Sequence, residues 1–136
     1  MEKKDTVVIF IFTDGKKILV EKRFLESLNQ NHYLIPGGTV KDFEKDLKDA
    51  LQREMMEELG VKPLSFKPIP TDGEIFGIHG QVLVPYLINK WAGRLPAAIL
   101  DKGNPLIWLE IGEVLNSPFE PTRKIAQALK KYLKTK

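Results

Sequence analysis

The sequence predicts an α/β (α+β) fold in which a mixed β-sheet packs between helices. Short β-branched and aromatic segments alternate with turn residues, which is typical of strands. Two longer segments, one central and one C-terminal, carry apolar residues at helical spacing. The resulting order is strands, a helix, more strands and a closing helix, and this order favours a sheet with helical cover.

Size and composition indicate one globular domain spanning residues 1–136. Hydrophobic residues make up 43% and charged residues 29%, as in ordinary soluble proteins. No apolar run is long enough to cross a bilayer, and the first five residues lack the apolar segment of a signal peptide. The absence of cysteine excludes disulfides and thiolate metal sites. We therefore expect a cytoplasmic protein.

The first two elements are predicted to form a β-hairpin. Residues 6–12 (TVVIFIF) are β-branched and aromatic and predict a buried strand. Asp14-Gly15 is a turn signal, and residues 17–22 (KILVEK) predict the second strand. Residues 24–32 are expected to be a loop.

A sharp turn is predicted next, at Pro36-Gly37-Gly38, after the short apolar piece 33–35. Proline interrupts regular strand pairing at this point. Glycine lets the backbone turn tightly and come close to a ligand. Gly37 and Gly38 are therefore candidate substrate-binding residues.

The central helix is expected to begin near residues 43–46 and to end at Gly60, which suits a left-handed cap. Leu51, Met55 and Leu59 recur every four residues and form an apolar stripe for the core.

The C-terminal half is predicted to add several strands and the closing helix. The expected elements are strands at 64–69, 74–78, 81–89 and 106–109, a turn at 79–80, a mostly irregular segment at 92–105, a helical turn at 111–115 and an amphipathic helix at 121–133.

Three carboxylates, Glu54, Glu57 and Glu58, fall at positions i, i+3 and i+4 and so lie on one face of the central helix. Glu54 and Glu58 are like charges one turn apart, which costs a free helix about 0.2–0.5 kcal/mol. A hard divalent cation such as Mg²⁺ would make this crowding useful. The alternative is a solvated acidic surface. Because the glutamates flank the apolar stripe, we expect them at the edge of a cleft.

A longer pattern surrounds these glutamates. Gly38 is followed after five residues by Glu44, and residues 53–61 (REMMEELGV) read Arg-Glu-apolar-x-Glu-Glu-x-Gly-apolar. This pattern resembles the Nudix box of the Nudix hydrolases, in which seven residues separate the two parts. Here eight residues separate Glu44 from Arg53. We place the extra residue in the loop or the first helical turn, before Leu47, so that the glutamates keep their mutual geometry while the presentation of Glu44 is altered.

Segments outside the box are also similar to that family. Residues 33–38 (YLIPGG) are similar to its aromatic-x-apolar-Pro-Gly-Gly lead-in, and Trp108 with residues 113–115 resembles its C-terminal tryptophan and short helix. The resemblance implies an α/β/α sandwich and hydrolysis of a pyrophosphate bond in a nucleoside diphosphate linked to another group, with Mg²⁺ or Mn²⁺ as cofactor.

The resemblance also implies roles for the residues of the box. Glu54, Glu57 and Glu58 are the expected metal ligands, and the backbone carbonyl of Gly37 is a further candidate ligand. Arg53 is expected to orient the glutamates by pairing with Glu57 and Glu44.

The group that deprotonates the attacking water is expected to be Glu54 or a carboxylate from a later loop. Asp101 and Glu74 are the candidates for that carboxylate. His32 and His79 lack metal-ligand spacing and are expected to be structural or exposed.

Some Nudix subfamilies carry a residue after the box that marks their substrate, and the sequence narrows the substrate class only through the absence of such residues. Positions 76–79 carry neither the proline of ADP-ribose hydrolases nor the tyrosine of diadenosine polyphosphate hydrolases. This favours a smaller substrate, such as a nucleoside triphosphate or a modified one. Phe76, Tyr86 and Trp108 could stack on a base, but a core role is favoured for each.

Two functions other than catalysis are less consistent with the sequence. A catalytically inactive Nudix-fold nucleotide-binding or regulatory module would usually have lost glutamates from the box, and all three are kept here. The net charge of +3 is concentrated in the C-terminal lysines, which complement a helix dipole and lack the aromatic residues of a nucleic-acid site. We therefore expect a nucleotide substrate and neither nucleic acid nor a membrane as partner, with monomer and homodimer both open.

Overall fold

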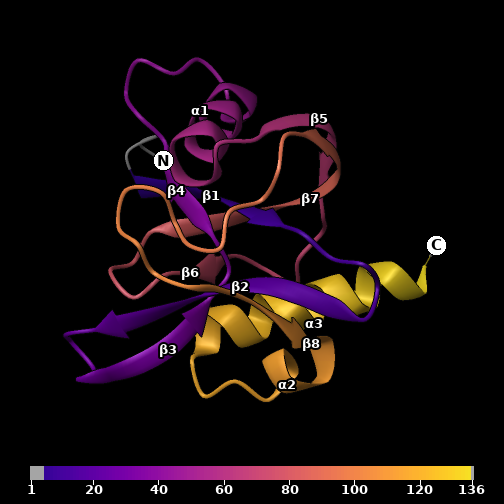
Figure 1. Cartoon of the computed structure of the whole chain (residues 1–136). Coiled ribbons are helices and arrows are strands. Elements are labelled where there is room, and N and C mark those ends of the chain that lie inside the picture. Colours follow the sequence, from indigo (N-terminus) through magenta and orange to yellow (C-terminus); the bar gives the residue numbers. More distant parts are fainter. Residues whose placement is uncertain (1–4, 136) are drawn as a thin grey trace.

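The strands of the computed structural model, which describes residues 5–135, form two sheets with helices around them (Figure 1). The elements in chain order are β1 (Thr6–Ile11), β2 (Lys17–Leu25), β3 (Gln30–Leu34), β4 (Gly37–Thr39), α1 (Leu47–Leu59), β5 (Lys62–Pro68), β6 (Ile75–Phe76), β7 (Val82–Ala92), β8 (Leu106–Glu110), α2 (Ile111–Leu115) and α3 (Glu120–Lys134).

The larger sheet has the strand order β4-β1-β7-β5, and β6 pairs with β7. β1 runs parallel to β7, and the other pairs in this sheet are antiparallel, so the sheet is mixed as predicted. The smaller sheet is antiparallel, with the order β3-β2-β8. The mixed α+β class is thus confirmed, with the strands divided between two sheets.

The predicted hairpin between the first two strands is wrong. Both edges of β1 are occupied, one by β4 and the other by β7, so β2 cannot pair along it. β2 instead pairs with β3 and β8 in the second sheet. Where β1 turns into β2, the links are the isolated bridge between Thr13 and Ile18, a hydrogen bond from Leu19 N–H to the Phe12 carbonyl (3.0 Å) and hydrogen bonds of Thr13 and Asp14 with Lys17.

The loop predicted at residues 24–32 is also wrong. β2 continues to Leu25 and β3 begins at Gln30, so the turn is short and contains Asn29 with a positive φ of 52°. Phe24 and Leu25 at the end of β2 pair with the polar Asn31 and Gln30 of β3, and all four are exposed or only partly buried. Because these strand ends extend beyond the core, the sequence shows no alternation of buried and exposed residues there.

Alternate residues of β1 serve two separate cores. Val8 and Phe10 face the core that holds α1, whereas Ile9 and Ile11 face the core that holds α2 and α3. Figure 1 shows the same layering, with α1 on one side of the strands and α2 and α3 on the other. The α/β/α arrangement follows from this period-two alternation.

Both amphipathic helices bury the predicted faces. Leu51, Met55 and Leu59 of α1 are fully buried, as are Ile125 and Leu129 of α3, while Leu133 is partly buried. No helix within residues 5–135 is long and apolar enough to cross a membrane.

Candidate active site

Two caps define the ends of α1, and its buried apolar stripe determines which face of the helix turns toward the core. The Asp46 side chain accepts a hydrogen bond from Asp49 N–H at 2.9 Å and caps the N-terminus. Gly60, with a φ of 68°, ends the helix as predicted, and its N–H donates to the Met56 carbonyl. With the apolar stripe in the core, Glu54 and Glu58 line a pocket beside the sheet.

Arg53 holds Glu44 in a bidentate ion pair, although the spacing between them departs from the family pattern. Arg53 Nε and Nη2 lie 2.9 Å from the two carboxylate oxygens of Glu44, and Nη2 also donates to the Thr39 carbonyl. The Lys41 N–H donates to Glu44 at 2.8 Å. Glu44 is 5% exposed. The loop before α1 therefore still delivers this carboxylate to its partner.

The same arginine contacts two of the glutamates on α1. Its Nη1 lies 2.9 Å from Glu57 and 3.2 Å from Glu54. Both ion pairs predicted for Arg53, with Glu57 and Glu44, are therefore present. One guanidinium group ties the loop before the helix to the acidic face of the helix.

We expect the stability contributed by Glu44 to fall at acidic pH. Hydrogen bonds from Arg53 hold the pKa of Glu44 below its ordinary value of 4.5. Because the folded-state pKa lies below the unfolded-state value, the pair stabilises the fold fully above the unfolded pKa. That contribution is lost as the pH falls through the folded pKa. Between about pH 5 and 3, the unfolding free energy of the wild type should therefore fall more steeply than that of Glu44→Gln.

Urea denaturation at several pH values measures both slopes. Glu113→Gln, at an exposed position on α2, is the matched control and should keep the wild-type slope. Parallel slopes for the wild type and Glu44→Gln would contradict the assignment.

Gly37 and Gly38 lie in extended backbone in β4, so the predicted sharp turn at these residues is wrong. A side chain at Gly37 would overlap the Val8 carbonyl and lie 2.7 Å from Ile9 Cδ1. A side chain at Gly38 would overlap the Glu54 carboxyl group. The glycines are thus required by close approach, to β1 in one case and to an acidic side chain in the other.

We expect Gly38→Ala to lower activity strongly while the fold survives. The added methyl group occupies the space of the Glu54 carboxyl, so the side chain must move away from the pocket. The change should lower kcat by about 100-fold, since small displacements of catalytic groups cost that much. Circular dichroism and a nucleotide hydrolysis assay test this, with Gly112→Ala, where an added methyl group meets nothing, as the control. Wild-type turnover by Gly38→Ala would show that the position of Glu54 is unimportant.

The carboxyl groups of Glu58 and Asp101 interact at the C-terminal end of α1. Burial, together with the charge and hydrogen bond of the neighbouring Asp101 carboxyl, raises the pKa of Glu58 to about 7 against the opposing charge of Lys102. The Leu100 N–H donates to the Glu58 backbone carbonyl at 2.9 Å and anchors this loop on the helix. Of the two later carboxylates proposed from the sequence, Asp101 is therefore next to the box, whereas Glu74 is exposed and does not line the pocket.

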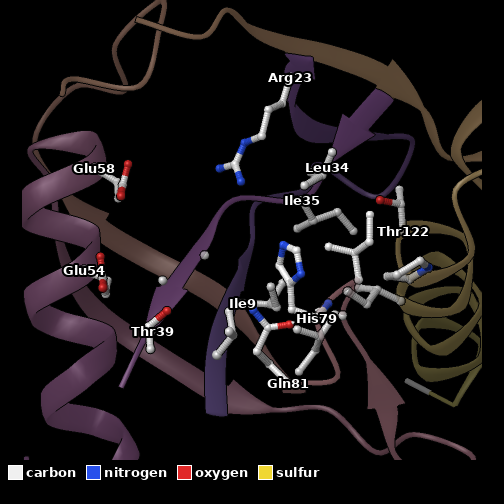
Figure 2. Close-up of a pocket in the computed structure, with 18 of the residues that line it drawn as sticks. Ile9, Arg23, Leu34, Ile35, Thr39, Glu54, Glu58, His79, Gln81 and Thr122 are labelled. Atoms are coloured by element: carbon white, nitrogen blue, oxygen red, sulfur yellow. Dashed lines mark hydrogen bonds between the residues drawn. The ribbon is translucent and has the colours of Figure 1, made fainter. Parts of the chain in front are cut away.

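The pocket has a volume of about 360 Å³ and a charged end and an apolar end (Figure 2). The charged end is formed by side chains of both signs, namely Glu54, Glu58, Arg23, Lys41 and Lys102. The rest of the lining is mostly apolar, with Ile9, Leu34, Ile35, Ile78, Leu83 and Ile125, and it includes the polar His79, Gln81 and Thr122. Gly37 and Gly38 lie on the wall of the same pocket.

Arg23 is a pocket residue that the sequence analysis missed. Its guanidinium is held by the buried Glu21, at 3.0 and 3.1 Å, and Asn104 donates to the same carboxylate at 2.8 Å. In Figure 2 the guanidinium points from β2 into the space between Glu58 and Leu34. In the sequence, the only indication of this pair is that Glu21 and Arg23 lie two residues apart, near the end of a predicted strand. This indication is weak, because an acidic residue in a strand is expected to be exposed unless its buried partners are known.

The aromatic candidates divide between core and surface. Tyr86 is buried beside Phe66, as predicted. Phe76 and Trp108 are 52% and 42% exposed, so the predicted core role is wrong for both. Phe76 lies on the two-residue strand β6, and Trp108 lies on β8, at the edge of the smaller sheet.

The two histidines differ in their surroundings. His32 is buried against Phe119, with a ring separation of 5.2 Å, and its Nε2 atom has no hydrogen-bond partner among the described residues. His79 is exposed and lines the pocket.

Comparison with known proteins identifies the family. The family model described as NUDIX domain matches residues 2–129. The chain belongs to the Nudix hydrolase family. No curated protein matches the sequence.

Solved structures with the same fold include Nudix proteins from several bacteria. The E. coli ORF135 protein is 26% identical, with a TM-score of 0.75 over 96% of this chain and 91% of its own. The MutT Nudix hydrolase of Burkholderia pseudomallei is 20% identical, with a TM-score of 0.70 over 91% and 96% of the two chains. The Nudix domain of Shewanella oneidensis NrtR, solved with ADP ribose, is 19% identical, with a TM-score of 0.66 over 94% and 87%.

Nudix hydrolases generally use divalent metals, and the donor atoms here are of the chemical type that such ions bind, although within the described part of the chain their side chains are not gathered into one cluster. Among residues 5–135 no three acidic or histidine side chains stand close enough together to hold a metal. Glu57 is paired with Arg53, and Glu58 meets Asp101. The available donors are carboxylate and carbonyl oxygens, which hard divalent cations prefer. A cation would also stabilise the two repelling carboxylates at the end of α1.

Proposed function

We propose that this Nudix hydrolase cleaves a pyrophosphate bond in a nucleoside diphosphate linked to another group, with Mg²⁺ or Mn²⁺ as cofactor. A nucleoside triphosphate, or a modified one, is the substrate class we favour. The observation that carries the proposal is the division of one pocket into a charged end beside the box and an apolar end. Such a pocket accommodates a phosphate chain at one end and a base at the other.

The metal would be held by Glu54, Glu57 and Glu58, with the Gly37 carbonyl as a further ligand. When bound, a divalent cation neutralises phosphate charge and activates water. Glu57 would first have to exchange its contact with Arg53 for the cation.

We assign the remaining steps to side chains of the chain itself. Glu54 accepts the proton of the attacking water, and Asp101 is the second candidate for this role. Burial raises the pKa of Glu54, and a raised pKa suits a carboxylate to proton transfer near neutral pH. Arg53 acts through the glutamates it contacts and is a positioning residue, as is Glu44 behind it.

The substrate phosphates would meet the positive side chains at the charged end. Arg23, Lys41 and Lys102 surround the acidic face of α1, and a guanidinium group can bind phosphate in a bidentate manner. Gly37 and Gly38 let the phosphates come close to the β4 backbone because neither carries a side chain.

A nucleotide panel tests the proposal. The purified full chain should release phosphate or pyrophosphate from at least one nucleotide in the presence of Mg²⁺ or Mn²⁺, and Glu57→Gln should lower that rate by at least about tenfold. Glu113→Gln, remote from the pocket, is the control and should keep the wild-type rate. Turnover undiminished in Glu57→Gln would contradict the roles assigned to the box.

Binding without turnover would instead favour the alternative, a nucleotide-binding module. The NrtR domain solved with ADP ribose shows that the fold can hold such a ligand. The retention of all three box glutamates in this chain favours catalysis.

A further inference from the structure

We infer that Gln81 reads the nucleobase and selects bases that carry an exocyclic carbonyl, namely 6-oxopurines and 4-oxopyrimidines. The inference rests on the proposed function, because it takes the ligand of the pocket to be a nucleotide. It names a specificity-determining residue and a substrate class.

Gln81 lies in the pocket, away from the residues of the box. It stands just before β7, in the turn that joins β6 to β7, and it is partly buried. In Figure 2 it projects beside Ile9 and His79, on the side of the pocket opposite Arg23. A base inserted at the apolar end would therefore meet this amide group.

The orientation of the amide is determined by the backbone. The His79 N–H donates to Gln81 Oε1 at 3.2 Å. Because a backbone N–H can only donate, the atom it meets must be the carbonyl oxygen and not the amino group. The Nε2 group, which has no hydrogen-bond partner among residues 5–135, is then free to donate to a ligand.

The turn around Gln81 leaves room for its amide. A Cβ atom at Gly77 would lie 2.8 Å from Gln81 Oε1 and 3.4 Å from Leu83 Cδ2. The φ of Gly77 is not positive, so its backbone conformation does not require glycine. The Gly77 N–H donates to the Gln81 carbonyl at 2.8 Å and closes the turn. Glycine at this position is explained by the space that the amide occupies.

A free amino group on the pocket wall distinguishes bases by their acceptors. It pairs with the oxygen at position 4 of uracil or position 6 of hypoxanthine. The amino group at the same position of cytosine or adenine would place two donors against each other. Because a site that loses a buried hydrogen bond discriminates strongly, we expect a preference of about tenfold for UTP over CTP and for ITP over ATP.

Four variants test the role of the amide. Gln81→Glu keeps the shape and replaces the donors by acceptors, so it should invert both preferences. Gln81→Leu should abolish them. Gly77→Ala should abolish them too, because the added methyl group displaces the amide while Gln81 remains. Gln127→Glu, the same change at an exposed position on α3, is the control and should leave both ratios unaltered.

The ratio of kcat/KM values within each pair is the measurement, and dissociation constants of the matching α,β-methylene nucleotides provide a readout without hydrolysis. Ratios cancel any general loss caused by the added negative charge. Base-selective binding that Gln81→Glu inverts, without turnover of any nucleotide, would refute the proposed function and support the inference. The inference would be overturned by equal ratios in the wild type, by a preference for amino bases, or by ratios that do not change in Gln81→Glu. A lack of nucleotide binding would also overturn it.

Discussion

Replacing Glu54 by glutamine is expected to lower kcat by about 10²–10⁴-fold, the contribution typical of general acid–base catalysis. Glu54 is only 6% exposed, lies against Gly38 and lines the pocket. Glutamine has nearly the same shape, so the contact with Gly38 is kept. It can neither accept a proton nor provide a charged metal ligand, and for these reasons we expect the loss in kcat.

The fold should tolerate this substitution. Burial disfavours the charged form of Glu54 and raises its pKa, so a neutral amide at the same position does not remove a strongly stabilised charge. Urea denaturation should therefore give an unfolding free energy within about 1 kcal/mol of the wild-type value. Glu113→Gln serves as the matched control for both measurements. A kcat within about threefold of wild type would remove Glu54 from the mechanism.

Replacing Arg53 by methionine is expected to lower the unfolding free energy by about 3–5 kcal/mol, as for other buried ion pairs that lose one partner. Glu44 is left buried without its bidentate partner, and the Thr39 carbonyl loses a donor. Glu54 and Glu57 lose their shared contact in the same step. Stability and turnover should therefore both fall, and Arg94→Met, at an exposed position, is the control for each.

A double variant separates the structural role of Arg53 from its positioning role. In Arg53→Met/Glu44→Gln the uncompensated charge is gone, and the amide oxygen at position 44 can still accept the Lys41 N–H. Stability should return most of the way to the wild-type value. Turnover should stay low, because no guanidinium orients Glu57. Recovery of both properties together would show that Arg53 serves stability alone.

Much of the α1 region could be predicted from the sequence because its determinants are local. The spacing of Glu54, Glu57 and Glu58 fixes their common face, since every residue of a helix advances by the same angle. Asp46 and Gly60 end the helix through contacts with near neighbours. The pair of Arg53 with Glu57 spans a single turn and was predicted for the same reason.

Strand pairing was harder to predict from the sequence, because it depends on segments far apart in the chain. Nothing near residues 6–22 shows that β4 and β7 occupy both edges of β1. The predicted sharp turn at Gly37 and Gly38 was also wrong, because these glycines are required by close contacts in an extended strand. The decisive neighbours, Ile9 and Glu54, come from other elements.

By itself, the sequence of this protein determined the family, the acidic face of α1 and the partners of Arg53 within the box, because a helix converts spacing directly into geometry. Only the tertiary structure decided which groups share the pocket with that face. Arg23 and Gln81 line the pocket from β2 and the β6–β7 turn, Asp101 neighbours Glu58 from the loop before β8, and no local pattern relates them. Their proximity follows from the packing of the two sheets and the loops that join them, which fixes distances between residues that the chain order leaves free.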